Sequence, residues 1–197
     1  MSSAINPQWV SMFHDTLSAL ADIPEREWSA AIARFRQVRI PKDGYFVRPG
    51  DKPDKLAFIA SGVFRVFFPT EDGDERVMAF REEGRLLSGF SSFLSNRESW
   101  FGIQALVDSD ILCMDIDQAA LSDWTDCWRN VYAKYMEMLF IEKEQREREF
   151  LSENAERRYR SFLEKYPALE GRIAQYHIAA YLGITPVALS RIRKTMK

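Results

Sequence analysis

The chain has 197 residues, of which 46% are hydrophobic and 28% charged, and its formal net charge is −2. This is the composition of a folded globular protein. No run of about 18 apolar residues and no basic, apolar leader is present, which excludes a transmembrane helix and a secreted destination. We therefore expect a cytoplasmic protein with no membrane partner.

The few cysteines and histidines exclude most metal chemistry. Cys113 and Cys127 could pair, but two cysteines in a chain of this size are typical of buried thiols in a reducing cytoplasm. An iron–sulfur cluster usually needs four thiolates, and a cupin-like metal enzyme needs two or three histidines beside a carboxylate. His14 precedes the predicted strands and His177 follows them, so His177 is expected to be a surface or packing residue. No metal ligand, catalytic residue or enzymatic activity is predicted.

Positive charge is concentrated near the C-terminus. From Arg157 onward there are nine basic and two acidic residues, a net charge of +7, so the rest of the chain carries −2 − 7 = −9. An acidic body with a basic tail indicates that the tail meets a polyanion. A solvated basic face is the plainer interpretation, and the motif within this segment decides between the two.

The N-terminal part divides into helices and a β-rich region. Residues 4–35 show helical spacing, with Trp28, Ile32 and Phe35 placed to pack against the next region. From Val38 short β-type runs follow, separated about every 8–12 residues by turns that contain glycine or Asp-Gly, which predicts an antiparallel sandwich, jelly roll or barrel. The runs are 38–40, 45–47, 56–59, 63–68, 76–80, 101–107 and 111–116.

A long helix is predicted over residues 118–151. Its apolar side chains follow 3-and-4 spacing and form one stripe, which needs a partner. The stripe is core against the β-rich region or a seam shared with a second copy of the helix, and both can hold at different positions. Ser152 and Asn154 then mark a break and a helix cap. The stripe consists of Leu121, Trp124, Trp128, Val131, Tyr132, Tyr135, Met138 and Leu139.

Residues 175–194 contain the pattern with the clearest functional meaning. Ala179 is small enough for two helices to cross closely, and Gly183 tolerates the positive φ that a tight turn between them needs. Thr185 is a good N-cap, and Pro186 suits the first turn of a second helix. This spacing predicts a helix-turn-helix. The side chains expected inside it are Ile178, Ala179, Leu182, Ile184, Leu189 and Ile192.

The outward face of the second helix has the side chains that a DNA-reading helix uses. Arg191 can read guanine edges, Val187 can touch a thymine methyl group, and serine, threonine and lysine side chains can hold phosphates. The alternatives are an ordinary hairpin with a solvated face and a hairpin that binds a protein partner. The candidate DNA-binding residues are Thr185, Pro186, Val187, Ser190, Arg191 and Lys194.

The chain resembles the cyclic-AMP receptor protein and fumarate–nitrate regulator family of bacterial transcription regulators. The resemblance begins near Arg39. Residues 40–44 and 48–51 resemble the first β-roll turns of that family, residues 56–62 its next strand and glycine turn, and residues 175–194 its DNA-reading hairpin. The resemblance implies a sensor like a cyclic-nucleotide-binding domain and a long dimer helix. The partners it implies are double-stranded DNA, a second copy and RNA polymerase.

The phosphate-binding motif of the cyclic-AMP binders is not matched. Those proteins carry a Gly-Glu pair and then an Arg-Ser pair, and residues 88–89 and 99–100 of this chain, Ser-Gly and Ser-Trp, stand at those places. Arg97 could replace the missing arginine, whereas Trp100 would tend to fill the pocket and Glu142, on the long helix, would repel a phosphate. We expect no cofactor and either a small effector other than cyclic AMP or none. The candidate pocket residues are Ser88, Gly89, Arg97, Ser99, Trp100 and Glu142.

The predicted fold is α+β. Residues 1–117 would form N-terminal helices and a double-stranded β helix, a jelly-roll-like β roll that acts as the sensor. Residues 118–151 would be the dimerisation helix, and residues 152–197 the helix-turn-helix domain, without a C-terminal wing. The predicted function is a homodimeric transcription regulator that binds a pseudo-palindromic site and does not respond to cyclic AMP. A ligand- or protein-binding module is the alternative.

Overall fold

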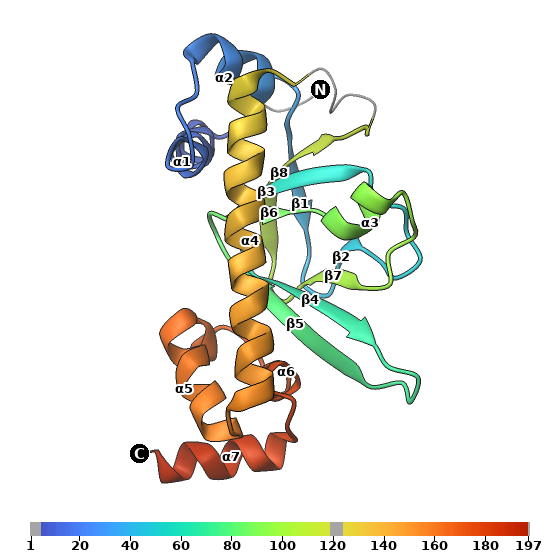
Figure 1. The fold of residues 1–197 in the computed structure, drawn as a ribbon, viewed down its shortest axis with the longest axis vertical. Coiled ribbons are helices and arrows are strands. Elements are labelled where there is room, and N and C mark those ends of the chain that lie inside the picture. The colour runs from blue at the N-terminus through green and yellow to red at the C-terminus, as the bar shows by residue number, and fades with distance from the viewer. Residues whose placement is uncertain (1–4, 119–123, 197) are drawn as a thin grey trace.

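The computed structural model describes residues 5–118 and 124–196 and confirms the predicted α+β fold (Figure 1). A β roll lies beside the long helix α4, two short helices pack near the start of that helix, and a helical module lies at its other end. No helix within the two described stretches is long and apolar enough to cross a membrane. The elements are α1 (Pro7–Ser18), α2 (Glu25–Ile32), β1 (Arg36–Ile40), β2 (Tyr45–Val47), β3 (Lys55–Ser61), β4 (Phe64–Pro69), β5 (Glu75–Arg81), β6 (Leu86–Leu87), α3 (Phe90–Ser95), β7 (Gly102–Ala105), β8 (Ser109–Asp115), α4 (Asp126–Ser152), α5 (Ala155–Lys165), the 3-10 turn η2 (Leu169–Gly171), α6 (Gln175–Leu182) and α7 (Pro186–Thr195).

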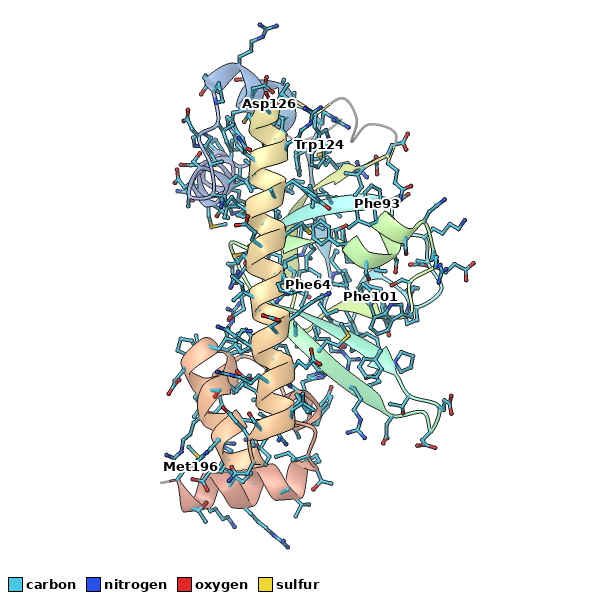
Figure 2. The ribbon with its side chains drawn as sticks, in the orientation of Figure 1. Phe64, Phe93, Phe101, Trp124, Asp126 and Met196 are labelled. Atoms are coloured by element: carbon cyan, nitrogen blue, oxygen red, sulfur yellow. The ribbon has the colours of Figure 1, made fainter. Side chains whose placement is uncertain are left out.

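Two four-stranded antiparallel sheets form the β roll. Their strand orders are β1-β8-β3-β6 and β2-β7-β4-β5. Because side chains alternate along a strand, each sheet turns one apolar face inward, and Ile59, Ile103 and Ile111 are buried there together with Phe64 and Phe101 (Figure 2). This arrangement confirms the jelly-roll-like roll expected from the spacing of strands and turns.

The tight turns lie at the positions predicted from the sequence. The Asp72-Gly73 turn joins β4 to β5, which pair in antiparallel register from Phe64 opposite Arg81 to the turn. Gly62, between β3 and β4, has a φ of 123°, and a Cβ atom at this position would lie 2.0 Å from Oγ of Ser109. Glycine is therefore required there for both conformation and space.

Two short elements, β6 and α3, were not predicted from the sequence. The strand β6 has two residues, too few to show alternation, and the six-residue helix α3 has too few turns to show a period. The predicted N-terminal helices are α1 and α2, which are separated by residues 19–24. Phe13 of α1 stacks on Phe58 of β3 with ring centroids 4.5 Å apart, so these helices do pack on the roll.

The long helix α4 begins at Asp126, later than the predicted start at residue 118. Residues 117–118 and 124–125 are not helical, and the predicted stripe residue Leu121 lies outside the described residues. In the first half of α4, Val131 and Tyr135 are buried against the roll. This half of the stripe is therefore core, one of the two partners that the sequence left open.

The second half of α4 is exposed on one side. Phe140, Ile141 and Leu151 retain 63%, 55% and 81% of their accessible surface. Apolar side chains of this size on one helix leave room for a partner.

Both cysteines are free thiols. Cys113 is buried in β8, where burial raises the pKa of its thiol, but Cys127 in α4 is only half-buried. The expectation of two buried thiols is therefore right for Cys113 and wrong for Cys127, because the start of α4 lies at the surface.

Candidate nucleic-acid interface and sensor cavity

The turn between α6 and α7 has the predicted geometry. Gly183 ends α6 with a φ of 69°, and the Ile184 N–H donates to the Ala179 carbonyl over 3.0 Å. A Cβ atom at Gly183 would also lie 3.0 Å from the Phe150 ring. Oγ1 of Thr185 then accepts a hydrogen bond from the Ala188 N–H over 3.2 Å, which caps α7. Each residue thus does what its type led us to expect.

The inner face of this hairpin is closed by apolar packing. Ala179, Leu182 and Leu189 are buried almost completely, whereas Ile184 and Ile192 are half-buried at the edge of the same cluster. Helix α7 is therefore held by one side only, and its other side faces solvent.

The six candidate DNA-binding residues share that open side. All of them are exposed, and Val187 retains 63% of its surface. Among the described residues, neither Arg191 nor Lys194 has a carboxylate partner, whereas Arg193 lies 2.9 Å from Glu170. The face carries two cations, a hydroxyl, a capping threonine and an apolar side chain, and α7 lies at the end of the molecule far from α1 and α2 (Figure 1). The residues are Thr185, Pro186, Val187, Ser190, Arg191 and Lys194.

The helical module is fixed to the β roll through α6. Phe80 of β5 meets Phe162, Tyr166 and Tyr181 with ring centroids 5.3–6.1 Å apart, and these rings belong to one buried cluster. Burial raises the pKa of the Tyr181 hydroxyl to about 12. The roll and the module therefore share a core.

A buried ion network joins the same parts. Oε1 of Glu142 on α4 lies 3.0 Å from Arg81 of β5 and 2.8 Å from Lys165 of α5. Burial alone would raise the pKa of the Glu142 carboxyl, but the charge of Arg81 and the hydrogen bond from Lys165 hold it below its usual value. Glu142 is thus ionised and its charge is compensated.

Arg146 of α4 connects the long helix to the end of α6. Its guanidinium lies 3.6 Å from the Tyr181 ring centroid and donates to the Tyr181 carbonyl. Arg158 donates to the next carbonyl, that of Leu182, over 3.0 Å. Cations at the C-terminal end of a helix satisfy carbonyls that have no intrahelical partner. The end of α6 is therefore held by side chains of its neighbours.

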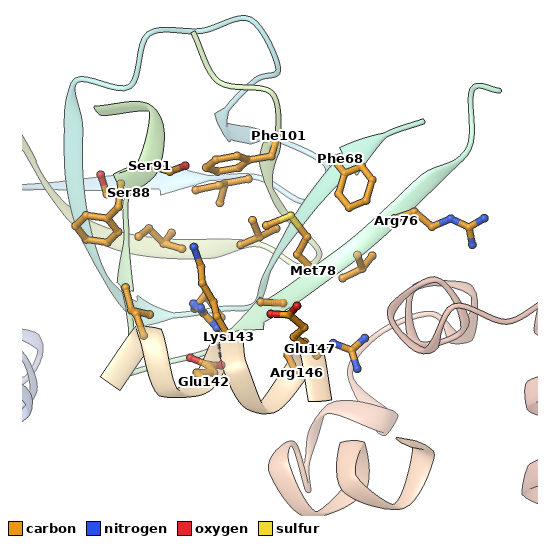
Figure 3. A pocket seen from close by; sticks show the side chains of 18 of the residues that line it. Phe68, Arg76, Met78, Ser88, Ser91, Phe101, Glu142, Lys143, Arg146 and Glu147 are labelled. Atoms are coloured by element: carbon orange, nitrogen blue, oxygen red, sulfur yellow. Dashed lines mark hydrogen bonds and ion pairs between the residues drawn. The ribbon is translucent and has the colours of Figure 1, made fainter. Parts of the chain in front are cut away.

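A cavity of about 750 Å³ lies between the concave face of the roll, α4 and the end of α6 (Figure 3). Most of its wall is apolar, with Val66, Leu87 and Phe101 from the roll and Leu139 from α4. Ala180 and Gly183 complete the wall on the side of the helical module. The cavity is of the size that holds small ligands.

Three of the six predicted pocket residues line this cavity. Ser88, Trp100 and Glu142 do so, and Trp100 stays 57% exposed at the rim against Phe68 and Phe101 instead of filling the space. The predicted repulsion by Glu142 is also corrected, since Arg81 and Lys165 neutralise its charge.

The other three predicted pocket residues lie elsewhere. Gly89 packs against Pro53, whose Cγ would be 2.4 Å from a Cβ at this position. Arg97 is exposed after α3, and the buried Ser99 donates its hydroxyl to the Phe101 carbonyl over 2.8 Å. Counting without gaps placed these residues at the pocket, but their chain neighbours Ser88 and Trp100 line it instead.

Lys143 and Arg146 are lining residues that sequence reasoning missed. The run 142–149 alternates charges and looks like a solvated face, but residues 139, 142, 143, 146 and 150 all line the cavity. Their spacing of three and four puts them on one side of α4. That spacing is the signal that could have found them.

Comparison with known proteins agrees with this architecture. Residues 37–120 match the family model of the cyclic nucleotide-binding domain. No curated protein sequence matches the chain. The match spans the strands of the roll, of which β4, β5, β6 and β7 carry residues that line the cavity.

Solved structures show the same fold over most of the chain. The c-di-GMP responsive global regulator CLP of Xanthomonas campestris is 16% identical, with a TM-score of 0.67 over 85% of this chain and 89% of its own. The catabolite activator protein of Thermus thermophilus is 22% identical, with a TM-score of 0.55 over 92% and 86%. A protein of Eubacterium rectale assigned to the CRP/FNR family is 16% identical, with a TM-score of 0.70 over 88% and 83%. The resemblance read from the sequence is confirmed for the cyclic nucleotide-binding domain and for the fold.

Proposed function

We propose that the chain is a transcription regulator of the CRP/FNR type, which binds double-stranded DNA through α7 and acts in the cytoplasm. The observation that carries the proposal is the outward face of α7, where Arg191 and Lys194 are exposed and, among the described residues, have no carboxylate partner. The turn at Gly183 and the cap at Thr185 set where α7, which carries this face, begins. A helix of this kind fits the major groove.

The proposed division of labour follows the architecture. The N-terminal helices and the roll sense a signal, α4 connects and dimerises, and α5–α7 bind DNA. The boundaries are those predicted from the sequence, residues 1–117, 118–151 and 152–197, with the helical part of the connector starting at Asp126. RNA polymerase is a further proposed partner, because a regulator of this type acts at promoters.

The proposed homodimer uses the exposed half of α4. Phe140, Ile141 and Leu151 are large apolar side chains that a second copy of the helix would cover. Two copies related by a two-fold axis would place two α7 helices on half-sites about one helical turn apart. Phe140→Glu should therefore give a monomer in analytical ultracentrifugation, whereas Glu137→Gln on the same helix should not.

The proposed effector is not cyclic AMP. Ser99 and Gly89 stand at the places of the family's phosphate-binding pairs. The Ser99 hydroxyl donates a hydrogen bond to a backbone carbonyl, and Gly89 packs on Pro53. Arg97 does not line the cavity. A cyclic phosphate would find neither the expected guanidinium nor the expected hydroxyl. Calorimetry that gives micromolar or tighter binding of cyclic AMP would contradict this part of the proposal.

The salt dependence of DNA binding tests the proposal. Affinity for duplex DNA should fall steeply between about 50 and 200 mM salt, because bound phosphates release counterions. The double variant Arg191→Glu/Lys194→Glu should abolish binding in a mobility-shift assay. Lys42→Glu/Lys52→Glu, which makes the same charge change at exposed positions of the roll, should retain it. Binding that survives the first double variant, or that salt does not weaken, would favour a protein partner for the hairpin.

A further inference from the structure

We propose that the cavity between the roll and α4 binds a hydrophobic monocarboxylate, with Lys143 as the partner of the carboxylate. The proposal rests on the proposed function in one respect: the ligand acts as the effector of a DNA-binding protein. Binding itself is a property of the cavity and is measured without DNA.

The walls of the cavity favour an apolar ligand body. Val66, Leu87, Phe101 and Ile103 face it from the two sheets, and Leu139 closes it from α4. A ligand with several hydroxyl or ring nitrogen groups would leave those groups without partners against such walls, at a cost for each one. An aliphatic chain or an unsubstituted ring system has no such cost.

The charge that reaches the cavity favours one anionic group. Arg81 and Lys165 share Glu142, and Arg146 lies 3.4 Å from Glu149. Lys143 also lines the cavity and has no carboxylate partner among the described residues. In Figure 3 its side chain extends from α4 into the cavity toward the strands.

The remaining cation of the wall does not compete with Lys143. Arg76 lines the cavity, but its guanidinium points away from it in Figure 3. Lys143 can therefore pair with the single carboxylate of a ligand whose other atoms are apolar, and the carboxylate of Glu147, which also lines the cavity, opposes further anionic groups.

A hydroxyl at the α3 end of the cavity also lacks a partner. Oγ of Ser88 is buried and has no hydrogen-bond partner among the described residues, and Ser88 lines the cavity. Buried polar groups are usually hydrogen-bonded, so an orphan of this kind indicates a group that a ligand would supply. A carboxylate oxygen accepts a hydrogen bond from a hydroxyl and from an ammonium group alike.

The cavity also explains how such a ligand would act on the DNA-binding module. Ala180 and Gly183 are part of its wall, and Arg146, which donates to the end of α6, lines it as well. A ligand that extends from Lys143 to this end of the cavity would contact the turn that sets the position of α7.

Calorimetric titration of the full chain with matched probes tests the proposal. Octanoate and 1-naphthaleneacetate represent an aliphatic and an aromatic acid, and octanol and 1-naphthaleneethanol are their uncharged counterparts. We expect at least one acid to bind more tightly than its alcohol and Lys143→Met to weaken that acid about tenfold. Lys134→Met, a control on the same helix whose ammonium pairs with Glu137, should leave the affinity unchanged. Which acid binds identifies the ligand body.

Three results would overturn the proposal: no binding of either acid up to millimolar concentration, equal binding of acid and alcohol, or an affinity that Lys143→Met leaves intact. Tighter binding of cyclic AMP than of both acids would overturn it as well. The same variants are assayed for DNA binding without ligand, where Lys143→Met should match the wild type. Failure of the wild type to bind either acid while it still binds DNA therefore counts against the ligand assignment alone, whereas failure of the wild type to bind DNA counts against the proposed function.

Discussion

Two sets of basic side chains in the helical module differ in their surroundings. Lys165, Arg172 and Arg193, the inward set, each lie within 2.6–2.9 Å of a carboxylate oxygen, from Glu142 of α4, Glu83 of the roll and Glu170 of the module respectively. Arg191 and Lys194, the outward set, have no such partner among the described residues. The net charge of +7 in this segment therefore overstates what a DNA phosphate would meet, because pairing decides which cations are available.

The largest loss of stability is expected at Glu142, the buried carboxylate that pairs with Lys165 of the inward set and with Arg81. Glu142→Gln would leave Arg81, whose side chain is 14% exposed, without its carboxylate. Removing one partner of a buried ion pair typically costs about 3–5 kcal/mol, so the free energy of unfolding should fall by about that much in urea titration. Glu144→Gln, at an exposed position of the same helix, should change it by less than about 0.5 kcal/mol. A small effect of Glu142→Gln would mean that the network does not hold roll and module together.

His177, on the inward side of the module, should make the stability of the protein depend on pH. It is 6% exposed on the inward side of α6, and burial, with Arg65 nearby, lowers its pKa to about 4 from 6.5. Glu75 and Asp43 act in the opposite direction and Lys42 in the same direction. Since the unfolded state takes up its proton first, the stability present above about pH 6.5 is lost as the pH falls toward about 4.

The difference between the pKa of about 4 in the folded protein and 6.5 in the unfolded chain sets the size of this effect. Between pH 7.5 and pH 5 the wild type should lose about 2 kcal/mol more stability than His177→Gln, in which the titrating group is absent. Urea unfolding of both proteins at the two pH values measures the difference. Parallel losses in the two proteins would show that His177 is not held neutral at the interface.

Substitutions in the outward set should weaken DNA binding and leave the free energy of unfolding unchanged. Arg191→Ala should cost about 1–3 kcal/mol on a cognate site and relax one base position, and Lys194→Ala should weaken all DNA to a similar extent. Arg193→Ala is the matched control, because this arginine has the same charge but pairs with Glu170. Fluorescence anisotropy on cognate and scrambled duplexes separates the three. If Arg193→Ala loses as much specificity as Arg191→Ala, the distinction between the two sets fails for DNA.

The sequence predicted the module better than the cavity, for a physical reason. The helix-turn-helix is local: the cap at Thr185, the left-handed Gly183 and the buried Leu189 each follow from neighbours within a few residues. The roll was predicted from its turns and short strands for the same reason. Sequence patterns are strongest where structure is set by near neighbours.

The cavity depends on contacts between distant segments. Lys143 and Ser88 line the same cavity only because α4 crosses the roll, and no spacing within either segment shows that. The gap-free count assigned Gly89, Arg97 and Ser99 to the pocket, but it could not tell which neighbours in each segment turn their side chains toward the cavity, as Ser88 and Trp100 do. The pairing of Glu142 with Arg81 and Lys165 could likewise not be predicted, since these residues are far apart in sequence. Residue type alone predicted repulsion where the fold supplies compensation.

The smallest effect is expected at the edge of the inward set. Arg172 reaches the β5–β6 turn and donates to Glu83 over 2.6 and 2.9 Å, but its side chain is 34% exposed, so solvent screens the pair. Arg172→Ala should therefore cost only about 0.5 kcal/mol in urea unfolding, and added salt should reduce that cost further. Arg160→Ala, which removes a still more exposed pair with Glu156 within α5, is the matched control and should cost no more than this. A loss at Arg172 as large as that at Glu142 would mean that the module is held mainly at its rim and not by its buried network.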